Sequence, residues 1–151
     1  MTEINLNKGG ARSSSRLAAV QALYQIEASD AKSLVVVHEF SEHRINEIID
    51  DECLAKADNK FFQDIVLGVE KRSEEIDKQL RENLKKDWSL ERIESVARAI
   101  LRAGAYELLA RPDVPTSVII NEYIDLTKAF YEDSTPGFVN GVLDKIAKIN
   151  R

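Results

Sequence analysis

Residues 114–148 carry two successive amphipathic helical patterns, and this stretch constrains the fold more than any other part of the chain. Core-type side chains recur at spacings of three and four, so each pattern predicts a helix with one buried face. The first pattern consists of Ile119, Ile120, Tyr123, Ile124, Thr127, Phe130 and Tyr131, and the second of Phe138, Val139, Val142, Leu143 and Ile146. Such faces require further helices to cover them, so we expect an all-α fold.

The start and end signals of these two helices are also present. Pro115 and Thr116 suit the first turn of the first helix, because proline is tolerated there and a threonine hydroxyl accepts a free backbone N–H. Residues 133–136 (Asp-Ser-Thr-Pro) are expected to stop that helix and cap the next one. Gly141 interrupts the second pattern at a cost of about 1 kcal/mol relative to alanine, and we interpret it as a point of close helix packing.

Four further helical patterns precede this pair. We expect helices at 14–28 (capped by serines 13–15), at 33–50, from Asp58 or Asn59 to about Leu84 with a bend within 70–75, and from Ser89 to Leu108. Residues 85–88 form the natural boundary between an N-terminal and a C-terminal half, with Trp88 expected to wedge between them. Arg92, Arg98 and Arg102 are interpreted as a solvated face.

The length of 151 residues fits one domain, with residues 1–12 as a mobile basic arm, 13–86 as the N-terminal half and 87–151 as the C-terminal half. The single cysteine, Cys53, cannot form an internal disulfide, which suits a reducing compartment. The N-terminus lacks the apolar stretch of a signal peptide, and no run approaches the ~20 apolar residues of a membrane span. We therefore expect a cytoplasmic protein without membrane contact.

The formal net charge of −5 argues against a protein that coats nucleic acid through overall positive charge. The charge is inverted locally, because the first sixteen residues carry Lys8, Arg12 and Arg16 against Glu3 alone. This run is either an ordinary solvated tail or a local nucleic-acid contact.

Motifs for catalysis, cofactors and metals are missing from the sequence. Gly9-Gly10 lacks the lysine of a phosphate-binding loop, and no Gly-x-Ser-x-Gly elbow occurs. His38 and His43 are five residues apart, which does not place two imidazoles on one helix face. The neighbouring carboxylates Glu74 and Glu75 point to different sides of a helix. We expect no enzyme activity, no cofactor and no metal.

Three motifs with fixed spacing resemble the NusB family of bacterial transcription antitermination factors. The longest reads VPxxVxINExIxLxKxF from Val114 and continues as FVNGVLDKI from Phe138. The others are Arg16 with the AVQALY of residues 19–24, and Leu101-Arg102 with the AYEL of residues 105–108. The resemblance spans nearly the whole chain, and it implies a bundle of about six or seven helices in two three-helix halves.

The resemblance also implies a function and partners. Proteins of this family bind the boxA sequence of nascent ribosomal RNA leaders together with NusE, a small-subunit ribosomal protein, and act with NusA, NusG and RNA polymerase in read-through of termination signals. Its implied mechanism is recognition of single-stranded RNA, with cations on phosphates and aromatic rings on bases. The residues carried over as RNA-binding are Arg12, Arg16, Lys128, Phe138 and, with less support, Asp133 and Asn140.

The chain departs from the family pattern where cations are expected. Ser13 and Ser14 stand in a region that often carries arginines, and Gly137 precedes Phe138 where relatives can carry a basic residue. Fewer cations predict weaker binding to RNA alone, which raises the importance of the protein partner. For Phe138 the alternative is a core residue, since an aromatic side chain on an apolar stripe is usually buried.

Two other functions remain open from the sequence. One is a relative of the NusB-like domain found on some ribosomal RNA cytosine methyltransferases, although 151 helical residues leave no room for their catalytic region. The other is a self-associating helical adaptor without an RNA role, because some NusB-like proteins form homodimers that cover the basic surface.

Overall fold

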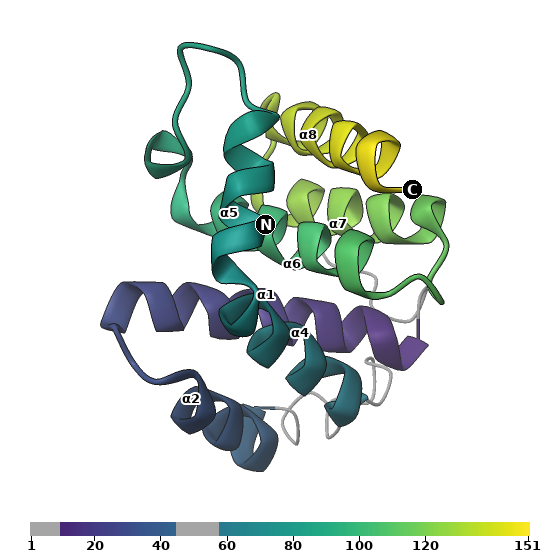
Figure 1. Cartoon of the computed structure of the whole chain (residues 1–151). Coiled ribbons are helices and arrows are strands. Elements are labelled where there is room, and N and C mark those ends of the chain that lie inside the picture. The colour runs from purple at the N-terminus through teal and green to yellow at the C-terminus, as the bar shows by residue number, and fades with distance from the viewer. Residues whose placement is uncertain (1–9, 45–57) are drawn as a thin grey trace. The chain divides into compact units, whose positions relative to one another are not determined.

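A computed structural model describes residues 10–44 and 58–151 of the chain (Figure 1). All the regular structure of this described part is helical, which confirms the all-α prediction. The α-helices are α1 (Gly10–Ser29), α2 (Ser33–Glu39), α4 (Asn59–Lys71), α5 (Ser73–Glu82), α6 (Ser95–Ala110), α7 (Thr116–Phe130) and α8 (Thr135–Asn150). A π-helical turn, η1 (Phe40–Arg44), and a 3-10 turn, η2 (Leu90–Arg92), accompany them. The described residues form two compact units, within 10–71 and 72–151.

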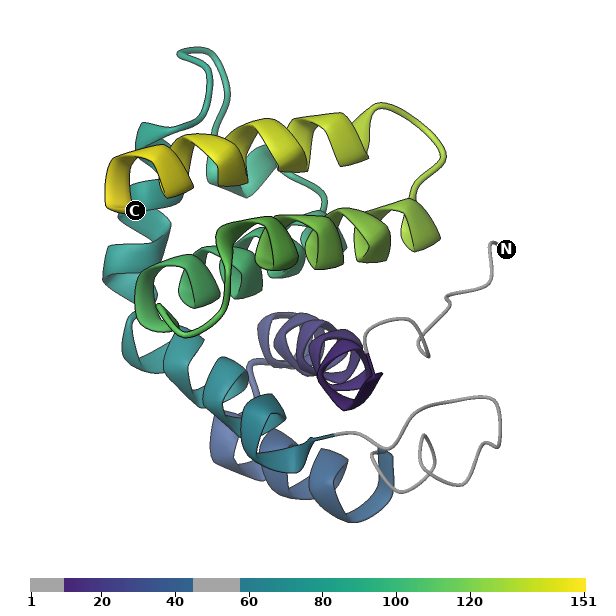
Figure 2. The same cartoon turned by 90° about the vertical axis from the view of Figure 1, so that its right-hand side faces the viewer.

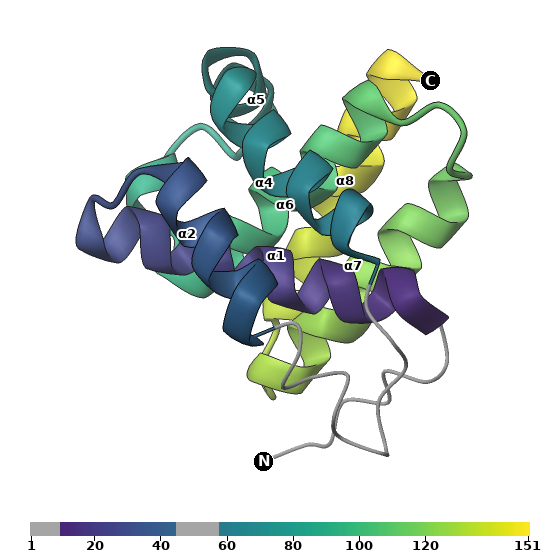
Figure 3. The same cartoon turned by 90° about the horizontal axis from the view of Figure 1, so that it is seen from below.

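The first unit consists of α1, α2 and α4, with α1 and α4 in the most extensive contact (Figure 3). α1 begins at Gly10, whose φ of 68° is readily adopted by glycine. Residues 10–12 are therefore helical and do not belong to an arm. The prediction that serines 13–15 cap the helix is wrong, because the helix starts upstream of them and buries all three.

A buried serine also fixes the start of α4. The Ser15 hydroxyl accepts a hydrogen bond from the Asp58 N–H (2.8 Å) and lies 2.6 Å from the Asp58 carbonyl oxygen. The Asp58 carboxylate accepts from the Phe61 N–H at 3.1 Å, which confirms Asp58 as the cap of this helix. The two longest helices of the unit are thus joined where α4 begins.

The second predicted helix, 33–50, is only partly a regular α-helix. α2 ends at Glu39 and continues as a π-helical turn to Arg44. Residues 45–50 lie outside the described residues, as do Cys53 and the first nine residues of the predicted arm.

The second unit contains α5, α6, α7 and α8, and α7 and α8 lie side by side (Figure 2). The run predicted from residue 58 to Leu84 breaks at Arg72, so that α4 and α5 are separate helices. α5 lies within the predicted N-terminal half (13–86), but its contacts place it with α6 and α8. Its Asp77 pairs with Arg102 of α6 through two hydrogen bonds of 3.0 and 3.2 Å.

Close packing around α8 involves a different glycine from the one expected. A Cβ on Gly104 of α6 would lie 3.0 and 3.1 Å from the Leu143 methyl groups, so α6 and α8 approach closely there. Gly141 is exposed, and a Cβ on it would meet nothing within 4 Å. The prediction for Gly141 is wrong because it lies on the outer face of α8.

The buried face of α7 is narrower than the sequence predicted. Ile119, Tyr123 and Thr127 are buried together with Leu126, whereas Phe130 is 43% exposed. Tyr131 lies beyond the last helical residue, and its hydroxyl accepts a hydrogen bond from the Ala97 N–H at 3.1 Å. The end of α7 is therefore held against the first turn of α6.

The predicted start of α6 at Ser89 is also wrong. Residues 90–92 form a 3-10 turn, and α6 begins at Ser95, where the Glu94 carboxylate accepts from the Val96 N–H at 3.0 Å. Trp88 does not form a buried wedge, because 44% of its surface is exposed.

Candidate nucleic-acid interface

Both units pair arginine with an aromatic ring. In the first unit the guanidinium carbons of Arg12 and Arg16 lie 4.6 and 4.9 Å from the centroid of the Phe61 ring. In the second unit the guanidinium carbon of Arg92 lies 4.9 Å from the centroid of the Trp88 ring. Such cation–π pairs stabilise local structure and also resemble the surfaces on which proteins stack RNA bases.

The pair in the first unit is a packing contact. Phe61 and Arg16 are each only 2% exposed, and Arg12 is half-buried in the first turn of α1. Two cations on one ring from one helix hold α1 against α4. A side chain as buried as Arg16 cannot reach a phosphate in this conformation, so its predicted RNA contact requires a rearrangement.

In the second unit a pocket of about 370 Å³ opens at the start of α8. Its lining residues are Trp88, Arg92, Ile93, Glu94, Ala97, Ser134, Thr135 and Phe138. Phe138 is half-buried, at the edge of the apolar face that Val139 and Leu143 continue into the core. The ring therefore has both a packed side and a side available to a ligand.

Several backbone N–H groups around this pocket donate hydrogen bonds to side-chain oxygens. In the first turn of α6, Val96 donates to Glu94 and Ala97 donates to the Tyr131 hydroxyl. At the start of α8, the Thr135 N–H donates to the Asp133 carboxylate at 2.9 Å. Hydrogen bonding by Thr135, first from its side chain and then from its backbone N–H, holds the pKa of Asp133 below its usual value. Asp133, which precedes the N-cap residue Ser134, therefore fixes the first residue of the helix that carries Phe138.

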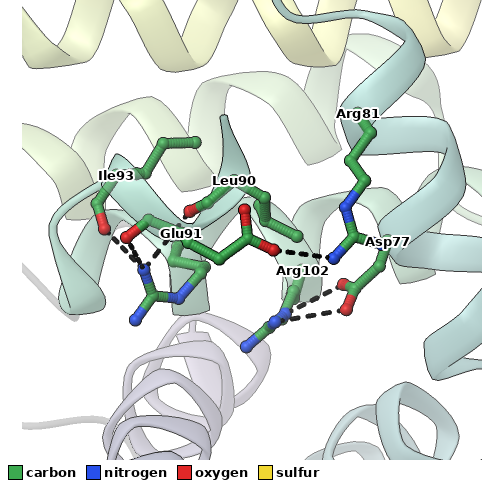
Figure 4. A network of polar contacts seen from close by, with 7 residues as sticks. Asp77, Arg81, Leu90, Glu91, Ile93 and Arg102 are labelled. Carbon is green, nitrogen blue, oxygen red and sulfur yellow. Dashed lines mark hydrogen bonds and ion pairs between the residues drawn. The ribbon is translucent and has the colours of Figure 1, made fainter. Parts of the chain in front are cut away.

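A polar network fixes the turn that supplies Arg92 (Figure 4). The Arg98 guanidinium donates to the carbonyls of Ile93 (2.6 Å) and Leu90 (3.3 Å). Arg81 pairs with Glu91 at 2.9 Å, and this bond lowers the pKa of the Glu91 carboxyl. The interpretation of Arg92, Arg98 and Arg102 as a solvated face is therefore wrong for Arg98, which holds η2 in place, and for Arg102, which is half-buried and paired with Asp77.

The predicted RNA-binding residues are divided between the units. Arg12 and Arg16 lie in the first, whereas Lys128, Asp133, Phe138 and Asn140 lie in the second. Lys128 is exposed in the last turn of α7, and Asn140 is exposed on α8, close to Phe138 in sequence. Of the six, Phe138 lines the pocket, and Asp133 is bonded to the backbone of its neighbour Thr135.

Trp88 and Arg92 line the pocket with Phe138 but were not predicted as site residues. An aromatic residue followed four positions later by arginine was the available signal, since such spacing often brings two side chains together. Their exposure could not be read from the sequence, because it follows from the 3-10 turn that begins after Trp88 and ends at Arg92.

Neither membrane spans nor metal clusters occur in the described residues. Over ranges 10–44 and 58–151, no helix combines the length and apolar content required to cross a bilayer. The same ranges contain no group of three or more His, Cys, Asp or Glu side chains arranged to hold a metal ion.

Comparison with known proteins identifies the family. The sequence model described as the NusB family matches residues 13–148. Transcription antitermination protein NusB of Caulobacter vibrioides is 50% identical over 137 residues, which cover 91% of this chain and 92% of that protein.

Solved structures share the fold. A NusB structure from T. maritima is 34% identical and gives a TM-score of 0.74, covering 91% of this chain and 90% of the other. A chain from a crystal structure of antitermination factors NusB and NusE in complex with dsRNA gives a TM-score of 0.76 at 24% identity. The match covers 91% of this chain and 96% of the other. Because the family match and the 50% identity both extend over nearly the full length, this chain belongs to the NusB family of transcription antitermination proteins.

Proposed function

We propose that this protein binds the boxA RNA of ribosomal RNA leaders together with NusE and thereby supports read-through by RNA polymerase, in a complex that includes NusA and NusG. The observation that carries the proposal is the half-exposed Phe138 ring, which lines a pocket within the family motif FVNGVLDKI. An aromatic ring at the edge of a folded body suits the stacking of an unpaired base.

The other candidate residues receive distinct roles in this proposal. Lys128 and Arg12 contact phosphates, because both have exposed or half-exposed cationic side chains. Asn140 offers an amide that can donate to and accept from a base edge. Arg16 and Asp133 support the site indirectly, through the α1–α4 contact and the first turn of α8.

The partner assignment is supported by the family and by the acidic charge of the chain. A related fold, at 24% identity, occurs in the structure described as NusB and NusE in complex with dsRNA. With a net charge of −5, the protein has little general attraction for RNA, so a second protein is needed for tight RNA binding. The RNA of that structure is double-stranded, whereas our proposal concerns unpaired RNA, so the test must include both single-stranded and duplex RNA.

The test is RNA binding measured by fluorescence anisotropy with labelled boxA RNA, with and without NusE at fixed salt. We expect the NusE complex to bind boxA RNA at least about tenfold more tightly than a scrambled RNA, as one or two base contacts of 1–3 kcal/mol would give. Binding to a boxA duplex should be weaker than to the single strand. Equal affinity for boxA and scrambled RNA would reject sequence-specific recognition.

Variants separate the roles within the site. Lys128→Ala should reduce the slope of log K against log salt by about 0.7, the value for one phosphate contact on a single strand. Lys148→Ala is the matched control, because Lys148 is an exposed lysine in the last turn of α8 that pairs with Asp144. An unchanged slope for Lys128→Ala removes that residue from the interface. Molecular mass in solution distinguishes the NusE complex from a self-associating adaptor.

A further inference from the structure

The pocket at the start of α8 has a second aromatic wall that the family motif does not include. Trp88 precedes η2, and its ring is 44% exposed with the Arg92 guanidinium 4.9 Å from it. Phe138 contributes the other ring from α8. The exposed part of the Trp88 ring offers a flat apolar surface on which a planar ligand can stack.

The chemistry of the pocket favours a flat, neutral ring over a free anion. Three N–H groups in the first turns of α6 and α8, those of Val96, Ala97 and Thr135, already donate to Glu94, Tyr131 and Asp133, so these three are not available to hold a phosphate. Glu94 also lines the pocket, and its carboxylate repels anions.

The polar groups at the rim suit the edge of a nucleobase. Glu94 offers carboxylate oxygens, and the Ser134 and Thr135 hydroxyls can donate or accept. The volume of about 370 Å³ lies at the small end of the ~300–1,000 Å³ range of ligand pockets. One base fits such a space better than a longer segment.

We infer that this pocket holds one unpaired nucleobase of the bound RNA, stacked against Trp88 and bordered by Phe138, with Arg92 beside the adjoining phosphate. The inference rests on the proposed function and deepens it, because it adds Trp88 and Arg92 to the RNA site. Stacking on an indole tolerates any base, so the contact contributes affinity more than sequence preference.

Trp88 is the only tryptophan in the chain, which allows a direct readout. The chain is labelled with 5-fluorotryptophan and mixed with unlabelled NusE, so that one fluorine NMR resonance reports on this ring. We expect boxA RNA to shift the resonance with the same midpoint as the anisotropy titration. NusE alone should leave it nearly unchanged.

Substitutions test the stacking itself. Trp88→Ala should weaken RNA binding by the NusE complex about tenfold, within the range for loss of one stacked base, and Trp88→Phe should restore most of that loss. Ile149→Ala is the matched control, since Ile149 is an exposed apolar residue at the far end of α8. The RNA affinity of this variant's NusE complex should be unchanged. Circular dichroism confirms that each variant is folded.

Three results would overturn the inference. An unmoved resonance with full RNA affinity for Trp88→Ala would show that no base enters the pocket, while the proposed function would stand. A shift caused by NusE alone, with weaker NusE binding by Trp88→Ala, would assign the pocket to the protein partner. Failure of the wild-type complex to bind boxA RNA would refute the proposed function itself.

Discussion

The two units use the same pair of residue types for different purposes. In the first unit, Arg16 and Phe61 are each 2% exposed, so their contact holds α1 to α4. In the second, Trp88 is 44% exposed and lies beside Arg92 and the pocket that contains Phe138. The difference predicts that the motif residue Arg16 preserves the fold, whereas the exposed pair is open to RNA. Exposure, more than residue type, separates the two roles.

The largest expected loss of stability follows from removing the buried contact between Arg16 and Phe61 in the first unit. Arg16→Ala removes a buried side chain and its desolvated cation–π contact, which alone is worth about 2 kcal/mol. We therefore expect the free energy of unfolding in urea to fall by roughly 2–3 kcal/mol. RNA affinity should fall only as far as the folded fraction falls. Full stability combined with lost RNA binding would instead make Arg16 a direct contact.

The next largest change in stability distinguishes a glycine packed between helices of the second unit from a glycine on its surface. Gly104→Ala places a methyl group against the buried Leu143 side chain, and overpacking of this kind costs about 1–3 kcal/mol, partly offset by better helix propensity. Gly141→Ala meets no neighbour and should stabilise the protein by up to about 1 kcal/mol. Thermal unfolding measures both. Equal shifts of Tm for the two variants would contradict the packing described for α6 and α8.

A smaller effect is expected at the exposed pair. Arg92→Ala removes a cation–π contact at a surface site, worth about 0.5–1 kcal/mol. The matched comparison with Arg16→Ala should therefore show a smaller loss of stability but a larger loss of RNA affinity per folded molecule. Denaturation and anisotropy on the same samples provide both values, and the opposite ranking would remove the distinction between the regions.

The smallest effect concerns the cap of α8. Because the folded pKa of Asp133 lies below its unfolded value, its ionised form stabilises the fold above the ordinary aspartate pKa, and this contribution disappears as the pH falls through the folded value. Asp133→Asn keeps an acceptor for the Thr135 N–H and should flatten that acidic part of the stability curve. Urea titrations from neutral to acidic pH test this, and identical curves for both proteins would exclude the cap as a source of pH dependence.

The sequence predicted the helices better than their ends. Apolar spacing located α6, α7 and α8, because tertiary burial selects one face of each helix. The predicted starts of α1 and α6 were wrong, since buried Ser15 binds Asp58, the residue that caps α4, and η2 separates Ser89 from α6. Local propensity does not contain such contacts.

The candidate site was only partly predictable for the same reason. Family spacing pointed to Phe138, which does line a pocket. It also pointed to Arg16, whose burial depends on how α1 packs against α4. Trp88 and Arg92 joined the pocket through a 3-10 turn that periodicity does not reveal.

Paired measurements on Phe138→Ala test the account most directly, because this residue belongs to both the proposed RNA site and the pocket. The account predicts that RNA affinity of the NusE complex falls about tenfold, as for one lost stacked base, while the free energy of unfolding falls by less than ~2 kcal/mol. Unchanged RNA affinity together with a stability loss of about 3–5 kcal/mol, the cost of removing a fully buried phenylalanine, would contradict it.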